Sequence, residues 1–214
     1  MLALFDLDNT LIDRQSGLEE WARRFTRSRS LPPTAALVIS ERLRERAYPA
    51  DLAEVGTVLG LSDPGRDLWR EYVEGMAGSA RCLPGAERGL RELRRAGWTL
   101  GVATNGAGDI QRAKLATAGL VPLFDAVCVS EEAGARKPAK RFFEAAVALC
   151  GTDLSAGGWM VGDNPDTDIE GGRAAGLRTM WIAAGRQWPT DVRSPDVTVA
   201  DVTEATAVLS ALAL

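Results

Sequence analysis

From Arg81 onward, short apolar runs alternate with segments of helical periodicity, and this alternation limits the folds that the chain can adopt. The apolar runs cover residues 98–105, 124–130, 158–163 and 179–185. Several of the segments between them begin near a proline or end at a glycine, which is typical of helices. Short runs that are apolar throughout suit strands that are buried on both faces. We therefore predict an α/β fold with a Rossmann-like, three-layer core, in which helices cover both faces of a parallel sheet.

The segment between residues 16 and 80 has a different pattern. It shows helical periodicity without apolar runs of the strand type, and prolines such as Pro32 and Pro49 divide it into several helices. The segment also follows the first predicted strand directly. We therefore predict two domains, a core formed by residues 1–15 and 81–214 and an inserted helical domain formed by residues 16–80.

Composition argues against several classes of partner. The 214-residue chain has a formal net charge of −4, and this acidic balance argues against nucleic acid or an anionic membrane as the main partner. No apolar run is long enough to span a bilayer, and we expect no targeting segment before the first strand. The three cysteines are widely spaced and form no Cys-x-x-Cys pair, so we predict a reducing, cytoplasmic location.

The absence of histidine restricts the chemistry that is open to the chain. Catalytic triads that contain histidine, imidazole metal sites and histidine proton shuttles are all excluded. Acid–base chemistry must therefore use carboxylates, lysine, tyrosine, cysteine or bound water.

Carboxylates stand where two of the predicted strands end. Asp6 and Asp8 follow the apolar start of the chain, and residues two apart in a strand point to the same side. Two carboxylates so close repel each other unless a cation neutralises them. Asp163 ends another apolar run in "VGDNPDTD" and would join them if the two strands are neighbours. Oxygen ligands of this kind suit Mg²⁺, so we predict a magnesium site at this edge of the sheet.

Other residues at the strand ends suit a phosphate group. Thr104 ends the strand in "VATNG", and Asn105 and Gly106 offer backbone N–H groups near the start of the next helix. Lys137 precedes a proline that opens a helix, and it is one of three lysines among 25 basic residues. A compact ammonium group can neutralise a single phosphate oxygen.

Four motifs in order make the sequence resemble the haloacid dehalogenase superfamily of aspartate-nucleophile phosphohydrolases. "FDLDNT" is similar to the Asp-x-Asp-x-Thr motif of that family, "ATNG" to its Thr/Ser motif and "RKP" to its lysine motif. "GDNPDTDIEGGRAAG" is similar to its Gly-Asp-x-x-x-x-Asp motif. The helical insert resembles the α-helical cap domain of one subfamily.

The resemblance implies a role for each matching position. Asp6 would be the nucleophile, and Asp8 would protonate the leaving oxygen and then activate water. Asp6 and Asp163 would bind Mg²⁺ through their side chains, and Asp8 through its backbone carbonyl. The transferring phosphoryl group would be held by Thr104, the Asn105 backbone and Lys137, while Asp168 would orient Lys137 and Thr10 would support Asp8. The implied function is hydrolysis of a small phosphomonoester through an aspartyl-phosphate.

Three alternatives remain at this point. Dehalogenation of haloacids uses the same nucleophile, but it needs no proton on the leaving group, so the second acid, Asp8, argues against it. A phosphomutase would need a cap that retains a sugar phosphate and excludes water. A non-enzymatic signalling module that is phosphorylated on aspartate would also gather acids, a threonine and a lysine at one edge of a sheet, but here the acceptor lies on the first strand.

The sequence does not identify the phosphate ester or the oligomeric state. Cap residues and the segment after Asp8 would select the leaving group. The candidates for contact with it are Asp13, Arg14, Trp21, Arg24, Tyr48 and Trp69.

Overall fold

The computed structural model describes residues 1–45 and 47–212, and it confirms the predicted α/β core. Six strands of the described part form one parallel sheet in the order β3-β2-β1-β4-β5-β6. The strands are β1 (Leu2–Phe5), β2 (Thr99–Thr104), β3 (Ala126–Val129), β4 (Trp159–Gly162), β5 (Arg178–Ile182) and β6 (Val197–Val199). The order reverses at β1, which lies between β2 and β4, and ligands of such sheets bind beyond the carboxyl ends of the strands at this point.

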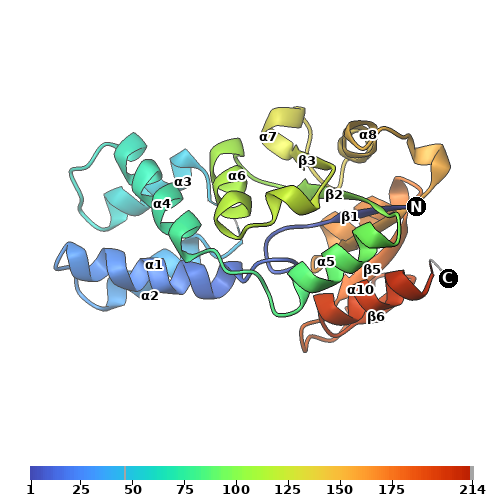
Figure 1. The fold of residues 1–214 in the computed structure, drawn as a ribbon. Coiled ribbons are helices and arrows are strands. Elements are labelled where there is room, and N and C mark those ends of the chain that lie inside the picture. Colours follow the sequence, from blue (N-terminus) through green and yellow to red (C-terminus); the bar gives the residue numbers. More distant parts are fainter. Residues whose placement is uncertain (46, 213–214) are drawn as a thin grey trace.

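The central strand β1 is buried on both faces because its side chains alternate between two hydrophobic clusters. Ala3 and Phe5 belong to a cluster with apolar residues of α5 (Ala86–Arg95) and α10 (Val202–Ala211). Leu2 and Leu4 belong to a second cluster with residues of α8 (Lys140–Leu149), such as Phe142 and Phe143. Figure 1 shows the helices on both sides of the sheet, which makes the predicted three layers.

The remaining core helices lie in the segments between the predicted strands, with one change of geometry. Helix α6 (Gly108–Thr117) follows β2, and a short α7 (Ser130–Ala133) that we did not predict follows β3. Two short 3₁₀ turns, η1 (Val121–Leu123) and η2 (Leu154–Ala156), also interrupt the connections. The predicted helical segment between the apolar runs 158–163 and 179–185 begins as a π-helix, η3 (Pro165–Glu170), and continues as α9 (Gly171–Ala174).

The start of η3 is fixed by Asn164. Its side-chain oxygen accepts hydrogen bonds from the N–H groups of Asp166 and Thr167, and its backbone carbonyl accepts from those of Asp168 and Ile169. One residue therefore satisfies several of the N–H groups that the first turn of a helix leaves without partners.

The inserted segment folds into four helices with a hydrophobic cluster of their own. These helices are α1 (Arg14–Ser28), α2 (Thr34–Arg42), α3 (Pro49–Val58) and α4 (Gly65–Ser79). Their cluster contains Leu18, Trp21, Phe25, Tyr72 and further apolar residues of the insert. Helix α1 begins at Arg14, two residues before the predicted boundary, because Asp13 accepts a hydrogen bond from the Ser16 N–H and caps the helix. The division into domains at residues 16 and 81 stays a prediction.

The helical insert lies beyond the carboxyl ends of the strands, at the opposite end of the sheet from the N-terminus (Figure 1). Helix α6 of the core packs against α4, since Ile110 belongs to the hydrophobic cluster of the insert and Trp69 Nε1 donates to Asp109 Oδ2 at 2.7 Å. The insert therefore covers the edge at which the predicted site residues lie. None of the described helices is both long and apolar enough to cross a membrane.

Candidate active site

The pairing of β1 with β4 brings the two acidic motifs together. Phe5 lies opposite Val161 in the parallel ladder, and the Asp6 N–H donates to the carbonyl of Val161 at 2.9 Å. Asp6 and Asp163 therefore follow neighbouring strands, which is the condition under which we expected them to share a site. The carboxylate oxygens of Asp6, Asp163 and Asp168 include one set in which all lie within 4.8 Å of one another.

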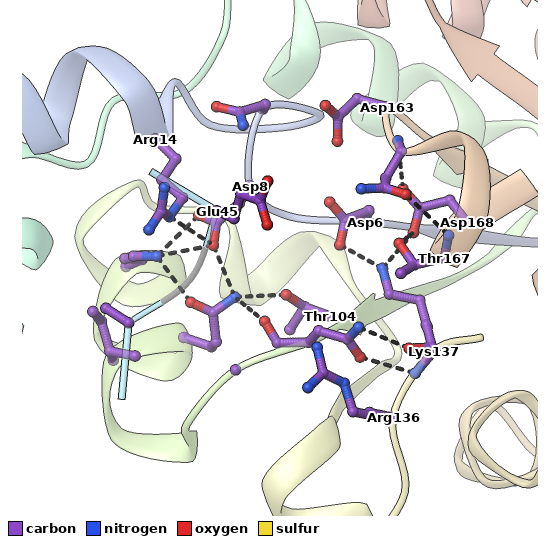
Figure 2. A pocket seen from close by; sticks show the side chains of 18 of the residues that line it. Asp6, Asp8, Arg14, Glu45, Thr104, Arg136, Lys137, Asp163, Thr167 and Asp168 are labelled. Carbon is purple, nitrogen blue, oxygen red and sulfur yellow. Dashed lines mark hydrogen bonds and ion pairs between the residues drawn. The ribbon is translucent and has the colours of Figure 1, made fainter. Parts of the chain in front are cut away.

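Lys137 lies between two of these acids. Its Nζ donates to Asp6 Oδ1 at 2.6 Å and to Asp168 Oδ1 at 2.7 Å, and all three residues are buried (Figure 2). Burial lowers the pKa of Lys137, but the charges of Asp168 and Asp6 outweigh burial and raise the pKa above its usual range. The lysine is therefore held in its charged form, next to the predicted nucleophile.

Burial disfavours the charged form of the acids in this group. Burial raises the pKa of Asp6, and Asp168 and Asp163 raise it further against the opposing charge of Lys137. Burial and Asp168 likewise raise the pKa of Asp163 to about 6, although Arg186 contacts its Oδ2 at 3.2 Å. A divalent cation would relieve this repulsion, and carboxylate oxygens are the donors that Mg²⁺ prefers. The donor set therefore fits the predicted ion.

Both carboxylate oxygens of Asp168 already accept hydrogen bonds from neighbouring residues. Its Oδ1 accepts from Lys137 and from the Thr167 hydroxyl, and its Oδ2 accepts from the Asn164 N–H at 3.0 Å. These bonds suit the predicted role of Asp168, which is to orient Lys137. The assignment of Asp6 and Asp163 as the side chains that bind magnesium stays a prediction.

The carboxylate of Asp8 points away from the three acids and toward helix α6 and Arg14. Lys114 Nζ donates to its Oδ1 at 2.9 Å and to its Oδ2 at 3.0 Å, and Gln111 Nε2 donates to Oδ2 at 3.2 Å. Arg14 Nε lies 3.8 Å from the same Oδ2. Burial alone would raise the pKa of Asp8, but the charges of Lys114 and Arg14 and the hydrogen bonds lower it overall. The predicted contact of Asp8 with the metal through its backbone carbonyl stays a prediction.

The predicted phosphate-binding residues lie beside Asp6, but one of the two expected backbone donors already has a partner. Thr104 ends β2 next to β1, and the Asn105 side chain joins this end to Lys137 by donating to its carbonyl at 3.1 Å and accepting from its N–H at 2.9 Å. The Gly106 N–H donates to the Ser130 hydroxyl at 3.0 Å, so this N–H is not free for phosphate. Asn105 therefore contributes by fixing the lysine loop, and its own backbone donor stays the predicted phosphate contact.

The side chain of Thr10 is fully buried. Its hydroxyl has no hydrogen-bond partner within residues 1–45 and 47–212. The expected support of Asp8 by Thr10 is therefore not visible as a hydrogen bond, because Lys114, Gln111 and Arg14 surround the carboxylate instead.

A cavity of about 490 Å³ opens above these residues, between the core and the helical insert. Of the residues that we expected to contact a leaving group, Arg14 and Tyr48 line it. Trp21 and Trp69 instead belong to the hydrophobic cluster of the insert. Asp13 caps α1, and Arg24 donates to the Gly75 carbonyl and the Ser79 hydroxyl.

Arg14 connects the cavity wall to Asp8. Its guanidinium donates to the carbonyls of Leu43 and Arg44 at 2.6 and 2.5 Å, and its Nε faces Asp8. The segment that it holds continues into Glu45, Ala47 and Tyr48, which line the cavity. Arg14 is itself buried. It therefore fixes a wall of the cavity from the first turn of α1.

Sequence reasoning missed Gln111, Lys114 and Arg186. Gln111 and Lys114 are three residues apart in a predicted helix that follows the Thr104 strand, so they share a helix face that starts at the site. The scarcity of lysine was a second available signal, and we applied it to Lys137 alone. Arg186 follows β5 in a loop, and no local pattern indicates its contact with Asp163.

Comparison with known proteins agrees with this geometry. The model of the haloacid dehalogenase-like hydrolase family matches residues 1–176 of this chain. The chain is 37% identical over 161 residues to the phosphoserine phosphatase of Thermus thermophilus, covering 75% of this chain and 63% of that protein. It is 34% identical over 142 residues to the pyrimidine 5'-nucleotidase YjjG of Escherichia coli, covering 66% of this chain and 62% of that protein. The matches thus span less than two thirds of the length of these two relatives.

The fold is also found in solved structures. The HAD-hydrolase YfnB of Bacillus subtilis, crystallised with magnesium bound, superposes with a TM-score of 0.79 over 97% of each chain. Its sequence identity to this chain is 24%, so the likeness shows a common fold.

Proposed function

Because this chain belongs to the haloacid dehalogenase-like hydrolase family, we propose that it hydrolyses a phosphomonoester of a small metabolite with the help of Mg²⁺. The observation that carries the proposal is the contact between Asp6 and Lys137 at the edge where Asp163 also lies. A nucleophilic carboxylate, a fixed positive charge and an acidic cation site are the parts that phosphoryl transfer needs. The names of the phosphatase and nucleotidase relatives support the same reaction class.

In the first half of the reaction, Asp6 attacks phosphorus. A bond forms between its carboxylate oxygen and phosphorus, and the bond between phosphorus and the ester oxygen breaks. Asp8, when protonated, gives its proton to that departing oxygen, which leaves as an alcohol. The product on the enzyme is an aspartyl-phosphate on Asp6.

In the second half, Asp8 takes a proton from water. The water oxygen attacks phosphorus, the bond to Asp6 breaks, and inorganic phosphate leaves. Asp6 is then a carboxylate again and Asp8 carries a proton, so the cycle is closed. No step needs histidine, which the chain lacks.

Lys137 and the end of β2 hold the transferring group. Lys137 is buried and charged, and its ammonium can neutralise a phosphoryl oxygen without reorganisation of solvent. The Thr104 hydroxyl and the Asn105 N–H would donate to the other phosphoryl oxygens. A magnesium ion held by Asp6, Asp163 and the Asp8 carbonyl would supply further positive charge against these oxygens when bound.

The cavity supports a small leaving group. Its volume of about 490 Å³ is within the range of ordinary small-molecule sites. Arg14, Glu45 and Tyr48 line it, so the cavity offers a positive charge, a negative charge and a phenol group to the substrate. We propose a small phosphorylated metabolite as substrate, in a cytoplasmic protein without a nucleic acid or membrane partner.

A phosphate-release screen over a metabolite panel tests the proposal. We expect release of many phosphates per chain with Mg²⁺, and loss of release when a chelator removes the metal. Activity that survives complete removal of divalent metal would contradict the mechanism. Release of chloride from 2-chloropropionate would place the reaction in the dehalogenase class. A stable phosphoprotein with a single turnover would favour the signalling alternative, and an isomerised sugar phosphate would favour the mutase.

A further inference from the structure

Lys114 is a buried cation that the proposed reaction does not use. Its side chain is 3% exposed, and its ammonium donates three hydrogen bonds, to both oxygens of Asp8 and to Gln111 Oε1 at 2.9 Å. An ammonium group has three N–H donors, so each of them is matched by an acceptor. Two of the three bonds hold the two oxygens of one carboxylate, which fixes how that carboxylate is turned.

Gln111 extends this arrangement to the phosphate site. Its Oε1 accepts from Lys114, while its Nε2 donates to Asp8 Oδ2 at 3.2 Å and to the Thr104 hydroxyl at 2.5 Å. Gln111 is 1% exposed. The general acid and the phosphate-binding threonine are therefore joined through a single amide group.

Both residues stand on a rigid support. They are three positions apart on helix α6, so they project from the same face. Other side chains of the same helix are packed in two hydrophobic clusters, with Leu115 in the core and Ile110 in that of the helical insert. A carboxylate that is bound by this face cannot turn without breaking several part-buried hydrogen bonds.

A purely stabilising role does not account for this arrangement well. Taking a lysine and an aspartate out of water is costly, and apolar residues of similar volume are often equally or more stable at such places. The pair lies beside the proposed nucleophile, where orientation has a direct effect on rate. A displacement of the acid by about 1 Å can cost on the order of 10²-fold in rate.

We propose that Lys114 and Gln111 are positioning residues that hold the Asp8 carboxylate in register with the phosphoryl group at Thr104, so that proton transfer to the leaving oxygen depends on them. This inference rests on the proposed phosphatase function and on Asp8 as its acid. It assigns to α6 a part in catalysis that none of the four sequence motifs contains.

The test compares two aryl phosphates of similar shape, phenyl phosphate and p-nitrophenyl phosphate. Phenol is the weaker acid, so its departure needs the proton from Asp8 more than that of p-nitrophenol. The measured quantity is kcat/KM, which reports the steps up to loss of the leaving group. For Lys114→Met we expect kcat/KM to fall about tenfold more on phenyl phosphate than on p-nitrophenyl phosphate, as for a weakened general acid. Lys140→Met, at an exposed lysine of α8, is the control. It should leave unchanged the ratio of kcat/KM on phenyl phosphate to kcat/KM on p-nitrophenyl phosphate.

A double-mutant cycle with Asp8→Asn tests whether Lys114 acts through Asp8. Once the acid is removed, Lys114→Met should cause no further change in the ratio of the two substrates. Gln111→Met keeps the lysine and should change the ratio in the same direction by a smaller factor, which covers the case that Lys114→Met does not fold. Thermal unfolding of each variant shows whether it is folded.

The outcomes separate the two proposals. If the wild type with Mg²⁺ releases phosphate neither from these two esters nor from any ester of the metabolite panel, the proposed function fails and this inference fails with it. If the wild type hydrolyses both and the folded Lys114→Met variant loses activity equally on both, or gains on phenyl phosphate, the inference alone is overturned. The same conclusion follows if Lys114→Met still changes the ratio in the Asp8→Asn background.

Discussion

The ammonium group of Lys137 lies 2.6 Å from Oδ1 of Asp6, although 131 positions separate the two residues in the sequence. The same ammonium donates to Asp168 at 2.7 Å, so one positive charge compensates two buried carboxylates. The contact has two consequences. It keeps a cation where a phosphoryl group would be transferred, and it makes the stability of the fold depend on a residue of the active site.

Replacing Lys137 by methionine should therefore destabilise the protein. The change leaves Asp6 and Asp168 buried without their partner, and breaking a buried ion pair on one side costs about 3 kcal/mol or more. Urea unfolding in the presence of a chelator measures the effect. Lys137→Met combined with Asp168→Asn should regain part of the loss, and Lys140→Met should cost little. Equal stability of the wild type and Lys137→Met would show that the contact contributes nothing to the fold.

Replacing Asp6 by asparagine should abolish phosphate release while the chain remains folded. Asparagine has nearly the same shape but cannot form the aspartyl-phosphate, and loss of a nucleophile lowers kcat by about 10³-fold or more. Burial already raises the pKa of Asp6, so removal of its charge should not lower thermal stability in chelator. Asp191→Asn, at an exposed aspartate, is the matched control. Turnover by Asp6→Asn close to that of the wild type would exclude Asp6 as the nucleophile.

In the metal-free protein, the carboxyl group of Asp163 should contribute a loss of stability as the pH rises from about 4 to about 6. Burial and Asp168 raise the pKa of Asp163 from an ordinary value of 3.8 to about 6 in the folded protein. Between these values the folded state binds more protons than the unfolded state, so the free energy of unfolding falls as pH increases. The shift amounts to about 3 kcal/mol at most.

The variant Asp163→Asn isolates this effect, because asparagine imitates the protonated acid. In chelator, wild type and variant should be equally stable near pH 4, and the variant should be the more stable at pH 7. Urea unfolding at several pH values provides the comparison. A difference between the two proteins that does not vary with pH would contradict the raised pKa of Asp163.

Arg14 should control the affinity for substrate more than the rate of the chemistry. Its guanidinium holds the carbonyls of Leu43 and Arg44, next to the cavity wall that contains Tyr48. For Arg14→Met we expect KM to rise about tenfold, which corresponds to about 1.4 kcal/mol of binding. Arg24→Met is the matched control, since Arg24 also stands on α1 but donates to Gly75 and Ser79 of α4, which do not line the cavity. A similar rise of KM in both variants would mean that the effect is a general loosening of the insert.

Local sequence patterns determined much of the fold and the first half of the site. Apolar runs, together with glycine and proline at helix ends, predicted the strands and most helices within a few residues, because these signals depend on neighbouring positions. The same local reading placed Asp6, Thr104 and Asp163 at strand ends. It did not predict the π-helical start at Pro165, because that geometry depends on how Asn164 satisfies several N–H groups at once.

The tertiary structure alone decided which of these residues meet. Asp6 and Asp163 share a site because β1 lies between β2 and β4, and the order of strands is not written in any local periodicity. The surroundings of Asp8 were likewise beyond the sequence, since Lys114 is 106 positions away and reaches it through the packing of α6. Hydrophobic patterns specify which face of an element is buried, whereas the partner across that face is fixed by the packing of the whole chain.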